Sequence, residues 1–137
     1  MKFVIDLQPI TKKNSQQIIT VKGRPMIIPS KAYNQYERDA LWLINYDGDP
    51  IDYPVNIKAT FYMKTRRRVD LVNLQEALLD VLVKAEVLAD DNNTIVASTD
   101  GSRVSYDKEN PRTEVEITRS EWVDKTIQTD SGERCSE

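Results

Sequence analysis

The organisation of this chain is set by Arg66-Arg67-Arg68-Val69-Asp70-Leu71-Val72-Asn73-Leu74-Gln75-Glu76, in which three arginines lead into a long apolar helix. About one helix length later, Leu88-Ala89-Asp90-Asp91-Asn92 adds two more carboxylates. Arginines can hold a phosphodiester backbone while acidic side chains hold a divalent metal ion. This combination indicates a metal-dependent nuclease.

The helix is expected to begin at or just after Asp70 and to run to about Val87. On a helical wheel its polar side chains form one narrow stripe: Asn73, Glu76, Asp80 and Lys84. The apolar arc covers roughly 240°, which is wider than one sheet face requires. This width predicts a helix buried on two sides, either in a central position or against a second copy of the chain. We therefore expect a homodimer.

The flanking sequence predicts short strands and one further helix. Residues 22–24 read as the turn of a hairpin, where Gly23 supplies a positive φ, and Ser30 reads as a helix cap. The strands are expected over residues 2–7, 18–21, 25–28, 55–63, 94–104 and 113–119, and the other helix over residues 31–46. This pattern predicts a single-domain α+β (mixed α/β) fold, with about five or six strands and two main helices.

The composition is that of one soluble globular domain, with 39% apolar and 30% charged residues among 137. We place that domain at residues 1–119 and expect the polar tail, residues 120–137, to be disordered. No apolar run approaches the ~20 residues of a membrane span. The N-terminus is too polar for a secretory signal, so the expected location is cytoplasmic, with no membrane partner.

Two absences narrow the chemistry. The chain has no histidine, which excludes mechanisms that need an imidazole base. Its single cysteine, Cys135, lies in the polar tail and offers neither a disulfide nor a zinc site. Acid–base and metal chemistry is therefore left to carboxylates and lysines.

The net charge of −3 conceals two basic segments. Residues 1–38 carry seven basic side chains against two acidic ones, and residues 58–70 carry five against one. Local patches decide whether a phosphate backbone can dock, although such patches can also be ordinary solvated surface. The expected DNA-binding side chains are Lys12, Lys13, Asn14, Lys31, Arg66, Arg67 and Arg68. Tyr33 and Tyr36 are expected in the core or a dimer interface rather than as platforms for bases.

The acidic residues also have simpler explanations when each is taken singly. Asp70 could only cap the helix, which contributes about 0.5–2 kcal/mol, and Asp90 and Asp91 could be a plain acidic turn. Together with the arginines they suggest a site, because a loop and strand returning beside the helix start could bring Asp91 to Asp70. Such oxygen ligands suit Mg²⁺, with Mn²⁺ as a possible substitute.

The chain resembles the RusA family of Holliday junction resolvases, which are small homodimeric endonucleases common in phages and prophages. The family pattern is a basic run, Asp-x-Asp-Asn-Leu, a lysine three residues after that Asn, an apolar helix and an Asp-Asp pair. The matching residues are Arg66–Arg68, Asp70, Asn73-Leu74, Ala77, Asp80, Leu82, Lys84-Ala85 and Asp90-Asp91. Residues 9–15 and 30–36 also resemble family segments, so the likeness covers roughly residues 1–119.

The resemblance implies a Mg²⁺-dependent enzyme that cuts four-way DNA junctions, and other branched DNA, by paired incisions in recombination, repair and replication. A symmetric dimer would suit a junction with near two-fold symmetry. The metal ligands of the family carry over onto Asp70 and Asp91, and Asp90 would assist.

Two positions depart from the family pattern. Its second aspartate falls on Val72 and its lysine on Glu76, which reverses that charge. Glu76 lies one turn beyond Val72 on nearly the same face, so we hypothesise that Glu76 supplies the missing carboxylate. The cationic role would then pass to one of the arginines or to Lys12 or Lys13. Alternatively, Glu76 only pairs with Asp80 and Lys84.

The altered motif leaves two further functions open. The chain could bind branched DNA without cutting it, as a catalytically impaired member of the family. A structural or interaction protein that does not bind nucleic acid would leave the segregated basic patches without a use.

Overall fold

The computed structural model describes residues 1–12 and 16–121 and has an α+β fold. The elements follow in the order β1 (Lys2–Ile5), β2 (Gln16–Val21), β3 (Arg24–Pro29), α1 (Lys31–Ile44), β4 (Val55–Met63), α2 (Leu71–Lys84), β5 (Val96–Ser98), β6 (Arg103–Tyr106) and β7 (Arg112–Arg119). Five strands form the main sheet and two form a separate hairpin. The expected fold class and the two main helices are therefore confirmed. The expected disorder of the tail falls on residues that lie almost entirely outside the described part.

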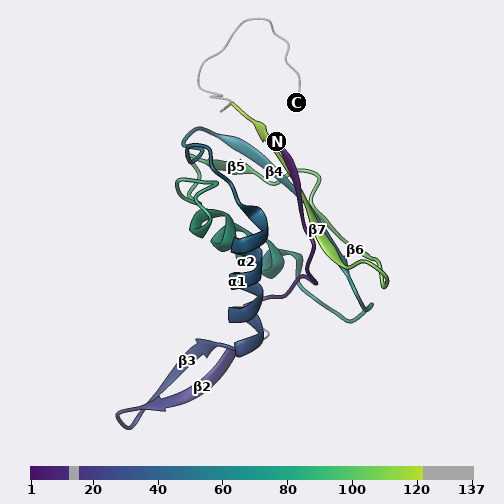
Figure 1. Cartoon of the computed structure of the whole chain (residues 1–137). Coiled ribbons are helices and arrows are strands. Elements are labelled where there is room, and N and C mark those ends of the chain that lie inside the picture. Colours follow the sequence, from purple (N-terminus) through teal and green to yellow (C-terminus); the bar gives the residue numbers. More distant parts are fainter. Residues whose placement is uncertain (13–15, 122–137) are drawn as a thin grey trace, which may run out of the picture.

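The main sheet has the strand order β1-β7-β4, with β5 and β6 sharing the far side of β4. β7 is antiparallel to β1 and β4, whereas β5 and β6 run parallel to β4 because α2 makes the crossover between them. Both helices lie on one face of this sheet (Figure 1). Alternation along β4 produces that face, since Val55, Ile57, Ala59 and Phe61 are all buried.

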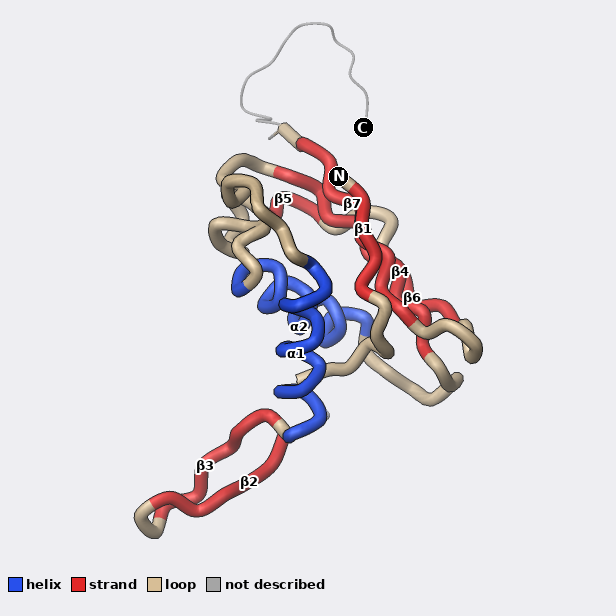
Figure 2. Tube along the Cα trace, viewed as in Figure 1, coloured by secondary structure: helices blue, strands red, loops and turns tan. Residues whose placement is uncertain are grey.

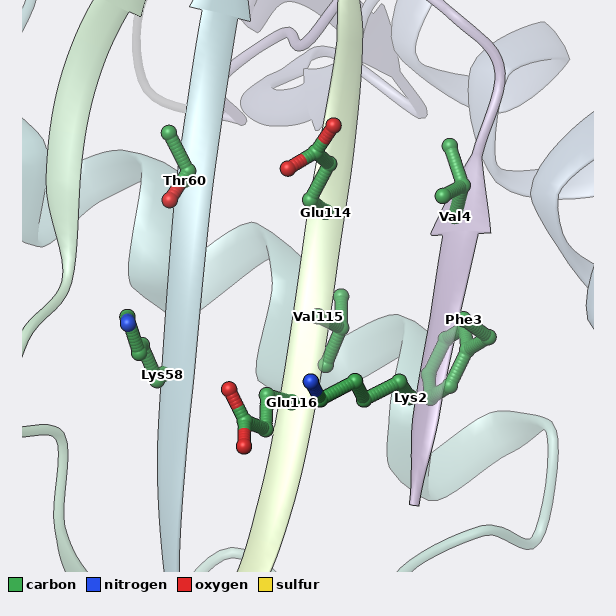
Figure 3. A pocket seen from close by; sticks show the side chains of 8 residues that line it. All are labelled: Lys2, Phe3, Val4, Lys58, Thr60, Glu114, Val115 and Glu116. Carbon is green, nitrogen blue, oxygen red and sulfur yellow. The ribbon is translucent and has the colours of Figure 1, made fainter.

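Within the described residues, the opposite face of the sheet carries no helix and is largely polar. Its side chains alternate with the buried ones and include Lys2, Lys58, Thr60, Glu114 and Glu116, which line a shallow pocket (Figure 3). A sheet with antiparallel pairs commonly keeps one face on the core and the other in water. The core thus lies between the sheet and the two helices.

The prediction of a single strand over residues 94–104 is wrong, because this segment forms two separate strands, β5 and β6. Residues 99–102 form a turn that interrupts the strand, and Gly101 has a φ of 87°. Ser102 replaces the missing ladder bonds: its hydroxyl accepts from the Ala59 amide at 3.0 Å and donates to the Ile57 carbonyl at 3.2 Å. Residues 98–103 contain no apolar side chain, and Asp100-Gly101 is a turn signal that the predicted strand passed over.

Local signals place α1 correctly at its start. The Ser30 hydroxyl accepts from the Tyr33 amide at 3.2 Å, as expected of a cap. The helix ends at Ile44, two residues earlier than expected, where Asn45 adopts a left-handed conformation with a φ of 42°.

α2 is covered largely within its own chain. Its buried residues Leu74, Ala77, Leu78, Val81 and Leu82 belong to the core cluster, and its partly buried apolar residues, namely Leu71, Leu79, Val83 and Ala85, pack against the same cluster. Only Val72, at 65% exposure, remains open among its large apolar side chains. The wide apolar arc is thus largely explained by the sheet and α1, and it no longer requires a second chain.

The β2–β3 hairpin extends beyond the start of α1 (Figure 2). Lys22 and Gly23 form its turn with φ values of 52° and 79°, and Val21 pairs with Arg24. Two successive positive φ angles are typical of a type I′ turn, whose twist matches that of the strands. No helix in the described ranges is long and apolar enough to cross a membrane.

Candidate functional site

The three arginines occupy the loop that joins the end of β4 to the start of α2. Arg66 stacks over the ring of Tyr106 on β6, with 4.2 Å between its guanidinium carbon and the ring centroid. Arg67 and Arg68 are exposed. The stack fixes one end of the loop against the sheet, which leaves the next two guanidinium groups open to a phosphate backbone. Tyr106 was not among the residues selected from the sequence.

Asp70 stands at the N-terminus of α2, but its side chain makes no capping hydrogen bond. One carboxylate oxygen accepts from Asn73 Nδ2 at 3.3 Å, and the residue is exposed. Asp70 therefore does not cap the helix through its side chain. Its carboxylate keeps oxygen lone pairs available to a ligand, next to Arg67 and Arg68.

Asp90 and Asp91 differ in how their carboxylates are used. The oxygens of Asp90 accept from the Asp91 amide at 2.7 Å and from Asn92 Nδ2 at 3.3 Å, so Asp90 stabilises its own loop. Asp91 is exposed, and its carboxylate forms no hydrogen bond or ion pair with any residue in the described part of the chain. Of the pair, Asp91 is the one available to a metal ion.

The fold places Asp70 and Asp91 at opposite ends of α2. The 14 residues of this helix span about 20 Å at 1.5 Å per residue. The loop that carries Asp91 is tied at one end to the segment before β4 and at the other to the first residue of β4: the Ala89 amide donates to the Ile51 carbonyl at 2.9 Å, and the Val55 amide donates to the Ile95 carbonyl at 2.8 Å. Asp70, by contrast, follows the other end of β4.

No group of three or more acidic residues within the described ranges lies close enough together to hold a metal ion. The sequence suggested that a strand would return Asp91 to the start of α2. The segment that returns there is the end of β6 instead, where the Asp107 amide donates to the Met63 carbonyl at 2.9 Å. A single chain therefore does not bring Asp70, Glu76 and Asp91 together.

Glu76 is exposed on α2 and has no ion-pair partner among the residues that the structure places. The neighbours suggested for it are engaged elsewhere: Asp80 pairs with Lys12 Nζ at 2.9 Å, and Lys84 pairs with Glu37 of α1 at 2.8 Å. The suggested pairing of Glu76 with Asp80 and Lys84 is therefore not formed.

Lys12 reaches the polar stripe of α2 from the loop after β1. The hydrogen bond to Asp80, assisted by the negative charges of Asp80, Glu37 and Glu76, raises the pKa of Lys12. Its ammonium also lies 5.8 Å from the centroid of the Tyr33 ring. A fixed positive charge therefore stands within the electrostatic range of Glu76, although it comes from a distant part of the sequence.

The other basic candidates divide between described and undescribed residues. Lys31 is exposed at the first position of α1. Lys13 and Asn14 lie outside the described residues, so their expected role stays a prediction. Tyr33 and Tyr36 are buried in the core, which was one of the two places expected for them. Burial raises the pKa of Tyr36 to about 12.

The fold and this arrangement define a small α+β protein in which an arginine loop borders an exposed carboxylate, a combination suited to phosphodiester chemistry. The chain belongs to the RusA family: the family model described as "Endodeoxyribonuclease RusA" matches residues 6–118. It is also similar to the crossover junction endodeoxyribonuclease RusA of Aquifex aeolicus (strain VF5). The two are 34% identical over 86 residues, which cover 61% of this chain and 66% of that relative, slightly under two thirds of its length.

Proposed function

We propose that this protein is a divalent-metal-dependent endonuclease that cuts Holliday junctions or other branched DNA. The observation that carries the proposal is the Asp70 carboxylate, which the helix terminus does not use and which lies two residues after the exposed Arg68. Membership of an endodeoxyribonuclease family and the similarity to a crossover junction enzyme support the same reaction and substrate.

The donor set fits Mg²⁺, with Mn²⁺ as a substitute. Asp70 and Asp91 are exposed carboxylates, and the chain has no histidine that would favour a softer metal. When bound, such an ion would activate water and stabilise the negative charge that develops on the oxygens around phosphorus. The role of Asp70 and Asp91 would be to hold the ion, and Arg67 and Arg68 would hold the neighbouring phosphates in position.

A homodimer would bring the Asp70 and Asp91 carboxylates close together. Two chains related by a two-fold axis, with their α2 helices antiparallel, would bring the start of one α2 near the 89–95 loop of the other. Each site would then combine Asp70 of one subunit with Asp91 of the partner subunit. Two identical sites related by symmetry would suit paired incisions in a four-way junction.

Glu76 and Lys12 would adapt the site to the altered motif. We hypothesise that Glu76 provides the carboxylate that position 72 lacks, since the two positions are neighbours on the helix surface. Lys12, held by Asp80 at 2.9 Å, would provide positive charge in place of the lysine that the family pattern has at position 76.

The second candidate is a protein that grips branched DNA without cutting it. Val72 favours this reading, because an apolar side chain that is 65% exposed stands where the family pattern has an aspartate. Binding through Arg67, Arg68 and Lys31 would survive the loss of a metal ligand, since phosphate contacts do not depend on the metal.

One experiment separates the two candidates. A labelled four-way junction is incubated with the protein in Mg²⁺, in Mn²⁺ and in EDTA, beside Asp70→Asn, Glu76→Gln and the control Asp47→Asn, which changes an exposed carboxylate in another loop. An enzyme should cut in at least one metal, and Asp70→Asn should lower the rate by about a hundredfold or more, as expected when a metal ligand or its immediate support is lost. A junction that is bound but never nicked would favour the binder, and normal cutting by Glu76→Gln would remove only the hypothesis on Glu76.

A further inference from the structure

The β2–β3 hairpin forms an arm that the rest of the described chain does not cover. Ile18 and Ile27 face each other across the two strands and are 75% and 65% exposed. A two-stranded hairpin is at best marginally stable alone in water, and an exposed isoleucine pair offers an unused apolar surface. The arm extends away from the main sheet and from both helices (Figure 2).

The tip and base of the arm are basic. Lys22 and Arg24 flank the turn and are exposed, and Lys31 is exposed where the arm meets α1. Residues 7–36 contain no acidic residue at all. The partner of this surface should therefore be negatively charged at its edges and apolar where Ile18 and Ile27 make contact.

We propose that this arm recognises the branch point of DNA, with Lys22 and Arg24 on phosphates and Ile18 and Ile27 against base faces. Within a continuous duplex the base pairs stack on each other, so only their edges are accessible in the grooves. At a branch point the stack is interrupted and base faces become available to apolar side chains, which can wedge between them. The inference rests on the proposed function, because it assumes that branched DNA is the substrate.

Charge argues for DNA rather than the arm of a second copy. Two arms brought together would place their Lys22 and Arg24 side chains near like charges, with no acidic residue on either arm to offset them. Phosphates offer the opposite charge at close spacing along both strands. Exposed isoleucines do not donate or accept hydrogen bonds, so the arm would select the shape of the DNA and not its base sequence.

The test compares a four-way junction with a linear duplex of the same arm sequence at one salt concentration, without metal. Affinity for each is measured by titration, and 2-aminopurine at the branch point reports unstacking. The variants are Ile18→Ser with Ile27→Ser, and Lys22→Gln with Arg24→Gln. The control is Trp42→Ser, which removes an apolar side chain that is 84% exposed on α1, outside the arm. All the changed side chains are exposed, and thermal unfolding by circular dichroism checks that the variants fold.

The isoleucine pair variant should lose on the order of tenfold in junction affinity and most of the fluorescence change, with duplex affinity nearly unaltered. The tip variant should weaken both complexes and lower the salt dependence. An unchanged preference of the isoleucine variant for the junction overturns the inference. So does a variant that changes only the sedimentation behaviour, because the arm would then be a contact between copies. If the unaltered protein neither binds nor cuts junctions, the proposed function itself fails, which is a different result.

Discussion

Mixing Asp70→Asn protein with Asp91→Asn protein should restore DNA cleavage that neither variant shows alone. Mg²⁺ binds its oxygen ligands at about 2.1 Å, so two carboxylates on one ion lie only a few ångströms apart. The helix between Asp70 and Asp91 spans about 20 Å, and the Asp91 loop is tied to the far end of β4. If the site forms between subunits, each variant homodimer has two defective sites.

The expected recovery follows from counting sites. Random exchange makes about half of the dimers mixed. Each mixed dimer keeps one intact site, which is built from Asp70 of the Asp91→Asn chain and Asp91 of its partner. The mixture should therefore have about a quarter of the active sites of the same amount of wild type. A mixed dimer has one active site, so its product should be a nicked junction and not a resolved one. Coexpression with two affinity tags and tandem purification isolates the mixed dimers for this assay.

Two controls distinguish sites that are shared between subunits from sites that lie within one chain. Asp70→Asn mixed with the double variant Asp70→Asn/Asp91→Asn has no intact site under any arrangement and should stay inactive. In an equal mixture of wild type with the double variant, about a quarter of all sites should be active if they are shared between subunits, and half if each lies within one chain. Purified mixed dimers of the two single variants that leave the junction intact, while wild type cuts it, would refute the shared site.

Two further predictions concern the fold. Between pH 9.5 and 11.5, wild type should lose on the order of 2 kcal/mol more of its free energy of unfolding than Tyr36→Phe loses, as measured by urea unfolding. Burial raises the pKa of Tyr36 to about 12. The buried neutral phenol therefore contributes its full stabilisation below the ordinary tyrosine pKa of about 10, and this stabilisation is lost as the pH rises through about 12. Equal losses in both proteins would contradict this prediction. Ser30→Ala should lower the free energy of unfolding by about 1 kcal/mol, because it removes the hydroxyl that accepts from the Tyr33 amide. Ser30→Thr keeps that hydroxyl and is the matched control, and an alanine variant as stable as wild type would disprove the cap.

Local chemistry made several features predictable. The Ser30 cap, the turn at Lys22 and Gly23, and the alternation along β4 each depend on residues close together in the sequence. The apolar arc of α2 was also read correctly as a helix covered on two sides. Its interpretation as evidence for a dimer was not required, because a periodic pattern states how much surface is buried but not which element covers it.

The candidate site was only partly accessible to the same reasoning. Motif spacing identified Asp70, Asp91 and the arginine loop, but not the stacking of Arg66 on Tyr106 or the ion pair of Lys12 with Asp80. These contacts join residues 40 and 68 positions apart, and no local signal encodes them. The family pattern already gave Asp91 as the ligand and Asp90 as its assistant, and the loop geometry adds that the Asp90 carboxylate is used internally.

The sequence by itself thus determined the helices, most of the strands, and the set of charged side chains available for chemistry, because short-range periodicity and capping are written in neighbouring residues. Only the tertiary structure decided where those side chains stand. The parallel pairing of β4 with β5 and β6 requires α2 to return the chain from the end of β4 to its start, and this crossover carries Asp70 and Asp91 to opposite ends of one helix. Two carboxylates that look like neighbours in a motif are therefore kept apart in one chain by the geometry of a parallel strand connection.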